Sequence, residues 1–453
     1  MIRIRLLAAL AVVTLVAAAC GRSGDGAGGG DAAEPTAAPT TAAPATDPPT
    51  TTAAHTTEAP TTTAAPTTTT AAPTTTAPPT TTVPPTTTIV TAFDSTPTTG
   101  TDSAIDSAPT TAEPPDTEAP ASSEPVATAG EWVALSGGED CTCADGSDYH
   151  YWVREGDLSK LVFYLQGGGA CFSQETCSFT GAGNAYDTNN DLSQAGDNPS
   201  EWDGIFDFEN PLNPLRDHSF VVALYCTGDV HLGDRTYDYG GGVIVHHNGF
   251  VNANTALDAA VERFGGATEV VVAGSSAGSA SAPLYGGLAA DLFSGATVAV
   301  VADASGAYPS DPGINSYVGG LWGTSRVIPD WPVNEGVTAA EYGLPELFIR
   351  SGMHAPRVRF ARYDNAFDST QEFFAGLAGF DASSIDQLMY QNEALIEAAG
   401  VDQASYMAPG RDHTILYRPL LYTQEVEGVA FLDWLTAFLG GTDVEDVACV
   451  DCS

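Results

Sequence analysis

The stretch EVVVAGSSAGSASAPLYGGLAADL, residues 269–292, joins a run of valines to a small-residue helical pattern. The continuous apolar run from Glu269 to Ala273 is typical of a parallel strand that is covered on both faces. Directly after it, Gly274–Ser279 has the form Gly-x-Ser-x-Gly with Ser276 at its centre. A strand that turns sharply into a helix at this point predicts a nucleophile elbow with Ser276 exposed at the turn. A plain small-residue turn is the alternative.

Similar apolar runs alternate with helical patterns along the rest of residues 128–453, which we interpret as one domain. The runs are Leu161–Gln166, Ser219–Cys226, Ala296–Asp303, Val358–Asp364 and Ala404–Gly410. The helical patterns are Asn252–Phe264, Gly278–Leu292, Ser384–Ala399 and Gln424–Leu439. This alternation predicts an α/β fold with a doubly wound, mostly parallel sheet and helices on both faces. Two further runs, GEWVALSGG and DYHYWVREG, predict an antiparallel pair at its start.

A nucleophilic serine needs a histidine as base, and in elbow hydrolases the chain order is serine, acid, histidine. Only His354 and His413 follow Ser276. His354 precedes a predicted strand, where the order would be wrong, whereas His413 follows the last one. We therefore expect His413 to be the base, against the alternative that it is an ordinary surface-loop histidine.

Three aspartates are candidates for the acid that orients the histidine. Asp364 ends a predicted strand, where the active sites of α/β proteins lie. Asp303 ends the preceding strand, and Asp368 follows Asp364 by one turn. We rank Asp364 first and Asp303 second, although each of these residues could instead cap a helix.

The run QGGGAC, residues 166–171, follows another predicted strand. Consecutive glycines let backbone N–H groups point into a cavity, so we expect Gly167 and Gly168 to join the N–H of Ala277 in an oxyanion hole. A structural glycine turn is the alternative.

Five motifs in this order resemble the pectin acetylesterase and Notum family of carboxylesterases, over nearly all of residues 135–440. They are LVFYLQGGGACFSQETC, YCTGDVHLGD, GSSAGS, ARYDNAFD and APGRDHT. The resemblance implies an α/β-hydrolase-like fold, the triad Ser276, Asp364 and His413, and the oxyanion donors Gly167, Gly168 and Ala277. It favours Asp364 over Asp303, because the family's aspartate lies about fifty residues before its histidine and Asp364 lies 49 before His413.

The chain departs from the family pattern beside the glycine run. Gly169 and Ala170 stand where relatives carry a tryptophan, Gln166 replaces a glutamate, and Ser279 stands where glycine is usual. An aromatic wall of the acyl pocket is therefore missing, which leaves the acyl preference open.

Seven cysteines in the domain suit an exported protein and leave one thiol unpaired. A Cys171–Cys177 bridge would resemble a family disulfide. We expect Cys141 and Cys143 to form two bridges with Cys449 and Cys452, which leaves Cys226 free. The competing interpretation is a zinc site formed by Cys141, Cys143, Cys449 and Cys452.

The N-terminus predicts export. Arg3 and Arg5 precede an apolar run that ends at Cys20. Residues 1–19 are therefore expected to be a signal peptide of the lipoprotein type, with Cys20 as the lipidated residue; an ordinary signal with a coincidental cysteine is the alternative. The Thr-, Pro- and Ala-rich residues 20–127 predict a disordered linker. The protein would then lie outside the cytoplasm, touching the membrane only through its lipid anchor.

The remaining features are less specific. His246, His247, Asp229, His231 and Asp234 lie in glycine-rich loops, and we take them as loop structure rather than metal ligands. Residues 308–347 predict an insertion or lid. Its Trp322 and Trp331 could stack on a sugar ring or simply pack.

Charge and motifs together define the expected function. Fifty-seven acidic residues face 15 Lys and Arg, for a formal net charge of −42, which excludes nucleic-acid binding. We expect a monomeric serine esterase, without metal or cofactor, that removes short acyl groups from an acylated glycan or another small ester. A long-acyl or lipid esterase and a non-catalytic glycan-binding domain are the alternatives.

Overall fold

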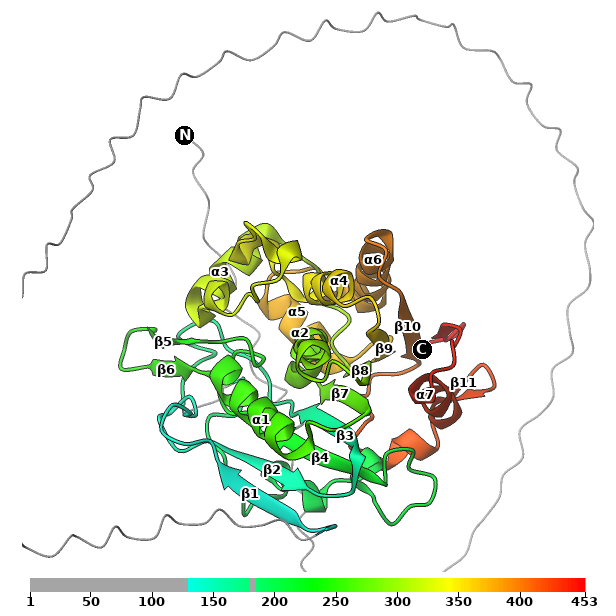
Figure 1. Cartoon of the computed structure of the whole chain (residues 1–453). Coiled ribbons are helices and arrows are strands. Elements are labelled where there is room, and N and C mark those ends of the chain that lie inside the picture. Colours follow the sequence, from blue (N-terminus) through cyan, green and yellow to red (C-terminus); the bar gives the residue numbers. More distant parts are fainter. Residues whose placement is uncertain (1–128, 180–184, 453) are drawn as a thin grey trace, which may run out of the picture. The chain divides into compact units, whose positions relative to one another are not determined.

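A nine-stranded sheet forms the centre of the described part of the chain, residues 129–179 and 185–452 of a computed structural model (Figure 1). The strand order across it is β1-β2-β4-β3-β7-β8-β9-β10-β13. The strands are β1 Trp132–Ser136, β2 His150–Arg154, β3 Asp157–Leu165, β4 His218–Ala223, β7 Glu269–Ser275, β8 Thr297–Asp303, β9 Arg359–Asn365, β10 Gln403–Ala408 and β13 Val447–Ala448. Neighbours from β4 onward run parallel, whereas β2 pairs antiparallel with both β1 and β4. The predicted fold class and the antiparallel opening pair are confirmed.

Helices cover both faces of this sheet. They are α1 Gly249–Phe264, α2 Ala277–Leu292, α3 Pro312–Trp322, α4 Leu344–His354, α5 Ser369–Leu377, α6 Ile385–Ala398 and α7 Phe431–Leu439. In β9 the ring of Phe360 contacts Phe348 of α4, while Tyr363 contacts Phe431 of α7. Residues three apart in a strand point to opposite faces, so α4 and α7 lie on opposite sides of the sheet.

One predicted helix is shorter than expected. The pattern from Gln424 to Leu439 predicts a single helix, but α7 begins only at Phe431. The preceding residues form a small hairpin of β11 Glu425–Val426 and β12 Val429–Ala430. A second small hairpin pairs β5 Arg235–Asp238 with β6 Ile244–His247.

Residues 308–347, the predicted insertion, contain α3, three short 3₁₀ turns and the start of α4. Trp322 and Trp331 are only 7% and 6% exposed, and both belong to a cluster of buried residues that includes Ala277 and Leu284 of α2. The insertion therefore packs on the helix that follows Ser276. Its two tryptophans serve packing rather than sugar stacking.

The disulfides correct part of the cysteine scheme. The predicted Cys171–Cys177 bridge is confirmed, but the others are Cys143–Cys226 and Cys449–Cys452, and Cys141 is the free, buried thiol. The expected bridges between the two ends of the domain are wrong, and so is the free Cys226. The zinc interpretation fails with them, because three of its four cysteines are oxidised. The sheet explains this: the first cysteines follow β1 at one edge, whereas the last two follow β13 at the other.

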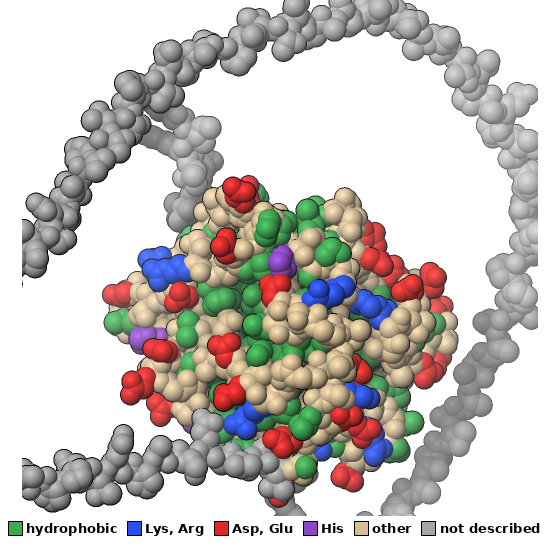
Figure 2. Space-filling view, in the orientation of Figure 1, with side chains coloured by type: hydrophobic (Ala, Val, Ile, Leu, Met, Phe, Trp, Pro, Cys, Tyr) green, Lys and Arg blue, Asp and Glu red, His purple; other side chains and the backbone are tan. Residues whose placement is uncertain are grey.

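The predicted signal peptide, Cys20 and the linker to residue 127 lie outside the described residues. Within the described ranges, no helix combines the length and the apolar character needed to cross a membrane. In Figure 2 acidic side chains outnumber basic ones on the face shown, in keeping with the net charge.

Candidate active site

Ser276 occupies a strained turn between the end of β7 and the start of α2. Its φ of 55° and ψ of −118° lie outside the regions that side-chain-bearing residues usually adopt. The neighbouring glycines make the turn possible. A Cβ atom at Gly274 would lie 2.4 Å from the carbonyl oxygen of Gly278, and one at Gly278 would lie 2.0 Å from that of Leu165. The predicted strand–turn–helix geometry is therefore confirmed.

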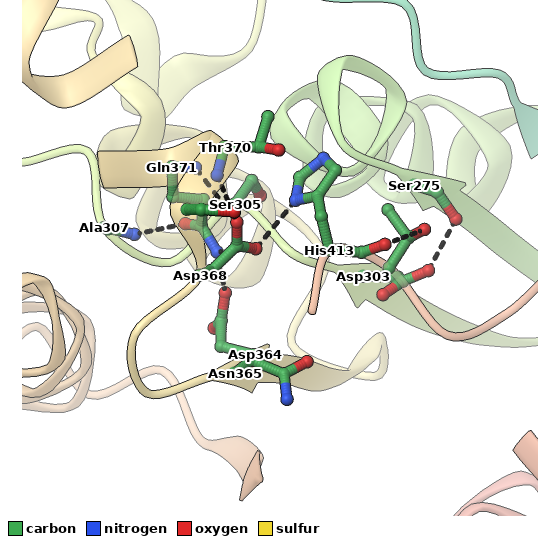
Figure 3. Close-up of polar contacts among 12 residues, drawn as sticks. Ser275, Asp303, Ser305, Ala307, Asp364, Asn365, Asp368, Thr370, Gln371 and His413 are labelled. Carbon is green, nitrogen blue, oxygen red and sulfur yellow. Dashed lines mark hydrogen bonds and ion pairs between the residues drawn. The ribbon is translucent and has the colours of Figure 1, made fainter. Parts of the chain in front are cut away.

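His413 lies in the loop that follows β10. Its Nδ1 atom is 2.7 Å from Oδ2 of Asp368, as Figure 3 shows. An ionised carboxylate only accepts hydrogen bonds, so Nδ1 carries the proton and Nε2 of the neutral ring is an acceptor. Nε2 is buried and has no hydrogen-bond partner in the described part of the chain. This arrangement leaves His413 ready to take a proton from a hydroxyl group.

Asp368 is held rigidly at the start of α5. One carboxylate oxygen, Oδ1, accepts the backbone N–H groups of Thr370 and Gln371 as the helix cap. The other oxygen, Oδ2, accepts His413 and the side-chain amide of Gln371. The Asp368 side chain is fully buried. A helix N-terminus thus fixes the orientation of the imidazole.

The expectation that Asp364 orients His413 is wrong. Asp364 lies inside β9 and forms a 2.8 Å ion pair with Arg362, two residues earlier on the same face of the strand. Its other oxygen accepts the N–H of Gly306 and the amide of Gln371. Both side chains of this ion pair are 2% exposed. Asp364 is linked to the histidine only indirectly. The side-chain amide of Gln371 donates to both Asp364 and Asp368, and Asp368 contacts His413.

Asp303, the second-ranked acid, holds together the two segments that carry Ser276 and His413. Its carboxylate accepts the hydroxyl of Ser275 at 2.6 Å and the N–H groups of Ile415 and Leu416 at 3.0 Å. Its backbone carbonyl accepts the N–H of Ser276. Asp303 therefore fixes the position of the serine turn relative to the histidine loop. It forms no hydrogen bond with the histidine itself.

Burial raises the pKa of Asp303 to about 6, which makes a testable difference to stability. Because this exceeds the pKa of an unfolded aspartate, the folded protein binds the Asp303 proton more tightly between about pH 4 and pH 6. The stabilisation is present at pH 4 and is lost as the pH rises through 6. Relative to Asp303→Asn, the wild-type free energy of unfolding should fall by about 1–3 kcal/mol across this range.

Urea unfolding of both proteins at pH 4, 5, 6 and 7 measures this difference. The other titrating groups are shared, so they cancel in the comparison. A difference that stays constant over the range, or grows with pH, would contradict the expectation.

The glycine run lies directly against the serine. A Cβ atom at Gly167 would lie 2.8 Å from Cβ of Ser276, so only glycine permits this approach. Ala277, the first residue of α2, follows the serine. Gly169 has a φ of 81°, and a Cβ there would lie 2.0 Å from the carbonyl oxygen of Ala185. The chain near Ala185 thus excludes any larger side chain at position 169.

The histidines of the glycine-rich loops are occupied by protein contacts. His247 bonds the carbonyl of Thr227 through Nδ1 and the hydroxyl of Tyr239 through Nε2. Burial lowers the pKa of His247 to about 4. His246 bonds the hydroxyl of Thr236. These contacts favour a structural role for the loops over metal binding.

Parts of this domain are similar in sequence to known proteins, and its fold is similar to that of a solved structure. The model of the pectinacetylesterase family matches residues 126–315. This part of the chain therefore resembles the pectin acetylesterase family. A palmitoleoyl-protein carboxylesterase, notum2 of Xenopus laevis, is 31% identical over 150 residues, which cover 30% of this chain and 28% of that protein. The fold resembles the Wnt deacylase Notum from Drosophila, with a TM-score of 0.50 and 15% identity over 69% of this chain and 94% of that structure.

Proposed function

We propose that this chain is an exported serine carboxylesterase that removes acetyl or other short acyl groups from the oxygen esters of a glycan. The observation that carries the proposal is the pairing of His413 with Asp368 beside the strained turn at Ser276. The match to the pectinacetylesterase model and the similarity to notum2, a carboxylesterase, support the same reaction class.

In this mechanism Ser276 attacks the ester carbonyl while Nε2 of His413 takes its proton. The tetrahedral oxyanion is bound by the N–H groups of Gly167, Gly168 and Ala277. The ester C–O bond then breaks, and His413 returns the proton to the leaving alcohol. Water attacks the acyl-serine by the same steps in the second half. Asp368 keeps the imidazole in the required tautomer throughout.

A non-catalytic binding domain accounts poorly for these features. Strained backbone at a non-glycine residue costs of the order of 1–3 kcal/mol, and a buried ring nitrogen without a partner adds a further cost. Ser276 and His413 carry these two costs. Catalysis gives a reason for both, whereas binding to a glycan gives a reason for neither.

The acyl preference follows from the family match. The model that matches residues 126–315 is that of a pectinacetylesterase, which favours an acetyl group over a long chain. The cavity between Ala280, Ser305 and Tyr308 has a volume of about 10 Å³ and offers no room for a long chain there.

A polar cavity beside the glycine run favours a substrate whose alcohol part is rich in hydroxyl groups. A cavity of about 380 Å³ has a mostly polar lining and reaches Asp187, whose carboxylate lies 2.6 Å from where a Cβ of Gly168 would be. The lining residues include Asn189, Gln194 and Asp197. Amide and carboxylate groups are suitable partners for sugar hydroxyls. With a net charge of −42, a neutral glycan is a better partner than a polyanionic one.

A series of esters tests the acyl preference. The purified full-length protein is expected to hydrolyse p-nitrophenyl acetate at least tenfold faster, by kcat/KM, than p-nitrophenyl palmitate, with butyrate between them. It should also release acetate faster from acetylated xylan than from acetylated polygalacturonate. A preference for palmitate would instead favour the long-acyl esterase.

We also infer export and anchoring through Cys20, which the three disulfides of the domain support. Cys20→Ser removes the only residue that could receive the lipid at the predicted cleavage site. This variant should move from the membrane fraction to the soluble fraction in a bacterial host that processes lipoproteins, with unchanged specific activity. Equal partitioning of both proteins would contradict the anchor.

A further inference from the structure

We propose that His231 is a positioning residue for the oxyanion hole, because its ring holds the peptide group that carries the N–H of Gly167. The inference rests on the esterase function proposed above. It gives a role to a buried histidine that the triad does not use and that lies in the motif YCTGDVHLGD.

The decisive contact joins the histidine to the residue before the glycine run. Nε2 of His231 lies 2.9 Å from the backbone carbonyl oxygen of Gln166. A carbonyl oxygen only accepts hydrogen bonds, so Nε2 carries the proton and donates it. His231 is 1% exposed, and burial lowers its pKa to about 4. The ring is therefore a neutral, fixed donor under ordinary conditions.

This bond sets the direction of the next N–H group. The peptide unit is planar and trans, so the N–H of Gly167 points opposite to the carbonyl of Gln166. The N–H of Gln166 donates to the carbonyl oxygen of Ala223 at the end of β4, so this edge of Gln166 faces β4. We therefore expect the N–H of Gly167 to face β7, the other neighbour of β3. The turn at Ser276 lies on that side, against Gly167.

The loop around His231 is fixed from several directions. His231 and Val230 have φ values of 58° and 48°, which for non-glycine residues require support from their surroundings. The His231 N–H donates to Asp229, and its carbonyl accepts the hydroxyl of Tyr285 at 3.0 Å. The ring also contacts Tyr225 at a centroid distance of 4.8 Å. A strained, fully bonded residue of this kind is suited to hold a neighbour in place.

Loss of the His231 donor should act on the transition state rather than on substrate binding. Without it the carbonyl of Gln166 loses its bond to the ring, so the peptide before Gly167 is held less firmly. The oxyanion forms only as the ester is attacked, so a misdirected N–H lowers kcat with little change in KM.

Three variants separate this role from general stability. His231→Phe removes the donor, whereas His231→Gln keeps an N–H that can reach the carbonyl. His218→Phe is the matched control, because it removes another buried histidine, at the start of β4, which bonds Glu269 away from the glycine run. We expect His231→Phe to lower kcat for p-nitrophenyl acetate about tenfold or more. His231→Gln should recover most of this loss, and His218→Phe should keep the wild-type kcat.

A trifluoromethyl ketone, which forms a tetrahedral adduct with an active serine, supplies an independent readout. Its affinity for the variants should fall in proportion to kcat/KM. A folded His231→Phe variant with wild-type kcat, or an equal loss in His218→Phe, would overturn the proposal.

A crystal structure of the wild-type adduct tests the geometry even where a variant fails to fold. It should place the adduct oxygen within about 3.1 Å of the Gly167 nitrogen. A Gly167 N–H directed away from the adduct would overturn the role of His231 while leaving the esterase intact. Failure of the wild-type protein to form any adduct at Ser276 would instead refute the proposed function, and this inference with it.

Discussion

Ser276→Ala is expected to lower kcat for p-nitrophenyl acetate by about a thousandfold or more. In the proposed mechanism the serine supplies the only atom that becomes bonded to the acyl group, so alanine leaves no nucleophile at the turn. Binding of the ester depends on other groups, and KM should change little. Steady-state hydrolysis by the two proteins, purified side by side, measures the effect.

Ser279→Ala is the matched control for this substitution. Ser279 lies one turn further along α2, and its hydroxyl bonds that of Ser305 at 2.6 Å inside the protein. Its loss should cost stability of about 1 kcal/mol without a comparable loss of rate. Equal, near-background rates for wild type and Ser276→Ala would refute the catalytic proposal and favour the binding domain.

Asp368→Asn is expected to reduce kcat by roughly 10³–10⁴-fold. An amide in this position can present its N–H₂ group to Nδ1 of His413, which shifts the ring proton to Nε2. Nε2 could then no longer accept the serine proton. The electrostatic stabilisation that the carboxylate gives to the imidazolium ion is lost as well, since a neutral amide does not offset the positive charge of the ring.

Asp364→Asn distinguishes the two acids. It leaves Arg362 without its closest partner in the interior, so it should destabilise the fold by several kcal/mol. The kcat of the folded fraction should nevertheless stay within about tenfold of wild type, because Asp368 still holds His413. If Asp364→Asn abolished kcat in a folded protein while Asp368→Asn did not, our assignment of the acid would be reversed.

Much of the scaffold is readable from periodicity, because buried parallel strands are continuous apolar runs. The strand–turn–helix at Ser276 and the loop position of His413 follow from motif placement alone. The identity of the acid does not. Asp364 and Asp368 both follow the same apolar run, and family spacing favoured the wrong one.

Local geometry distinguishes these two aspartates. Arg362 and Asp364 are two residues apart in a strand, so their side chains lie on the same face and can form an ion pair. This spacing is visible in the sequence. Asp368 lies beyond the strand, where it caps a helix with one oxygen and has the other left for His413. The sequence offers capping and orientation of the histidine as alternatives, yet the carboxylate of Asp368 makes both contacts. The cysteine pairs cannot be predicted for a different reason, because pairing depends on which sheet edge each residue reaches.

The carboxylate of Asp303 also bears on when the protein becomes active. It receives bonds from a turn near residue 275 and from a loop near residue 415, so both reacting side chains depend on one junction. A newly made chain that has formed β7 and β8 but has not yet docked residues 414–453 would have a serine without a base. Hydrolysis should therefore begin only when the C-terminal segment has closed onto the sheet, and the onset of activity would report the completion of folding.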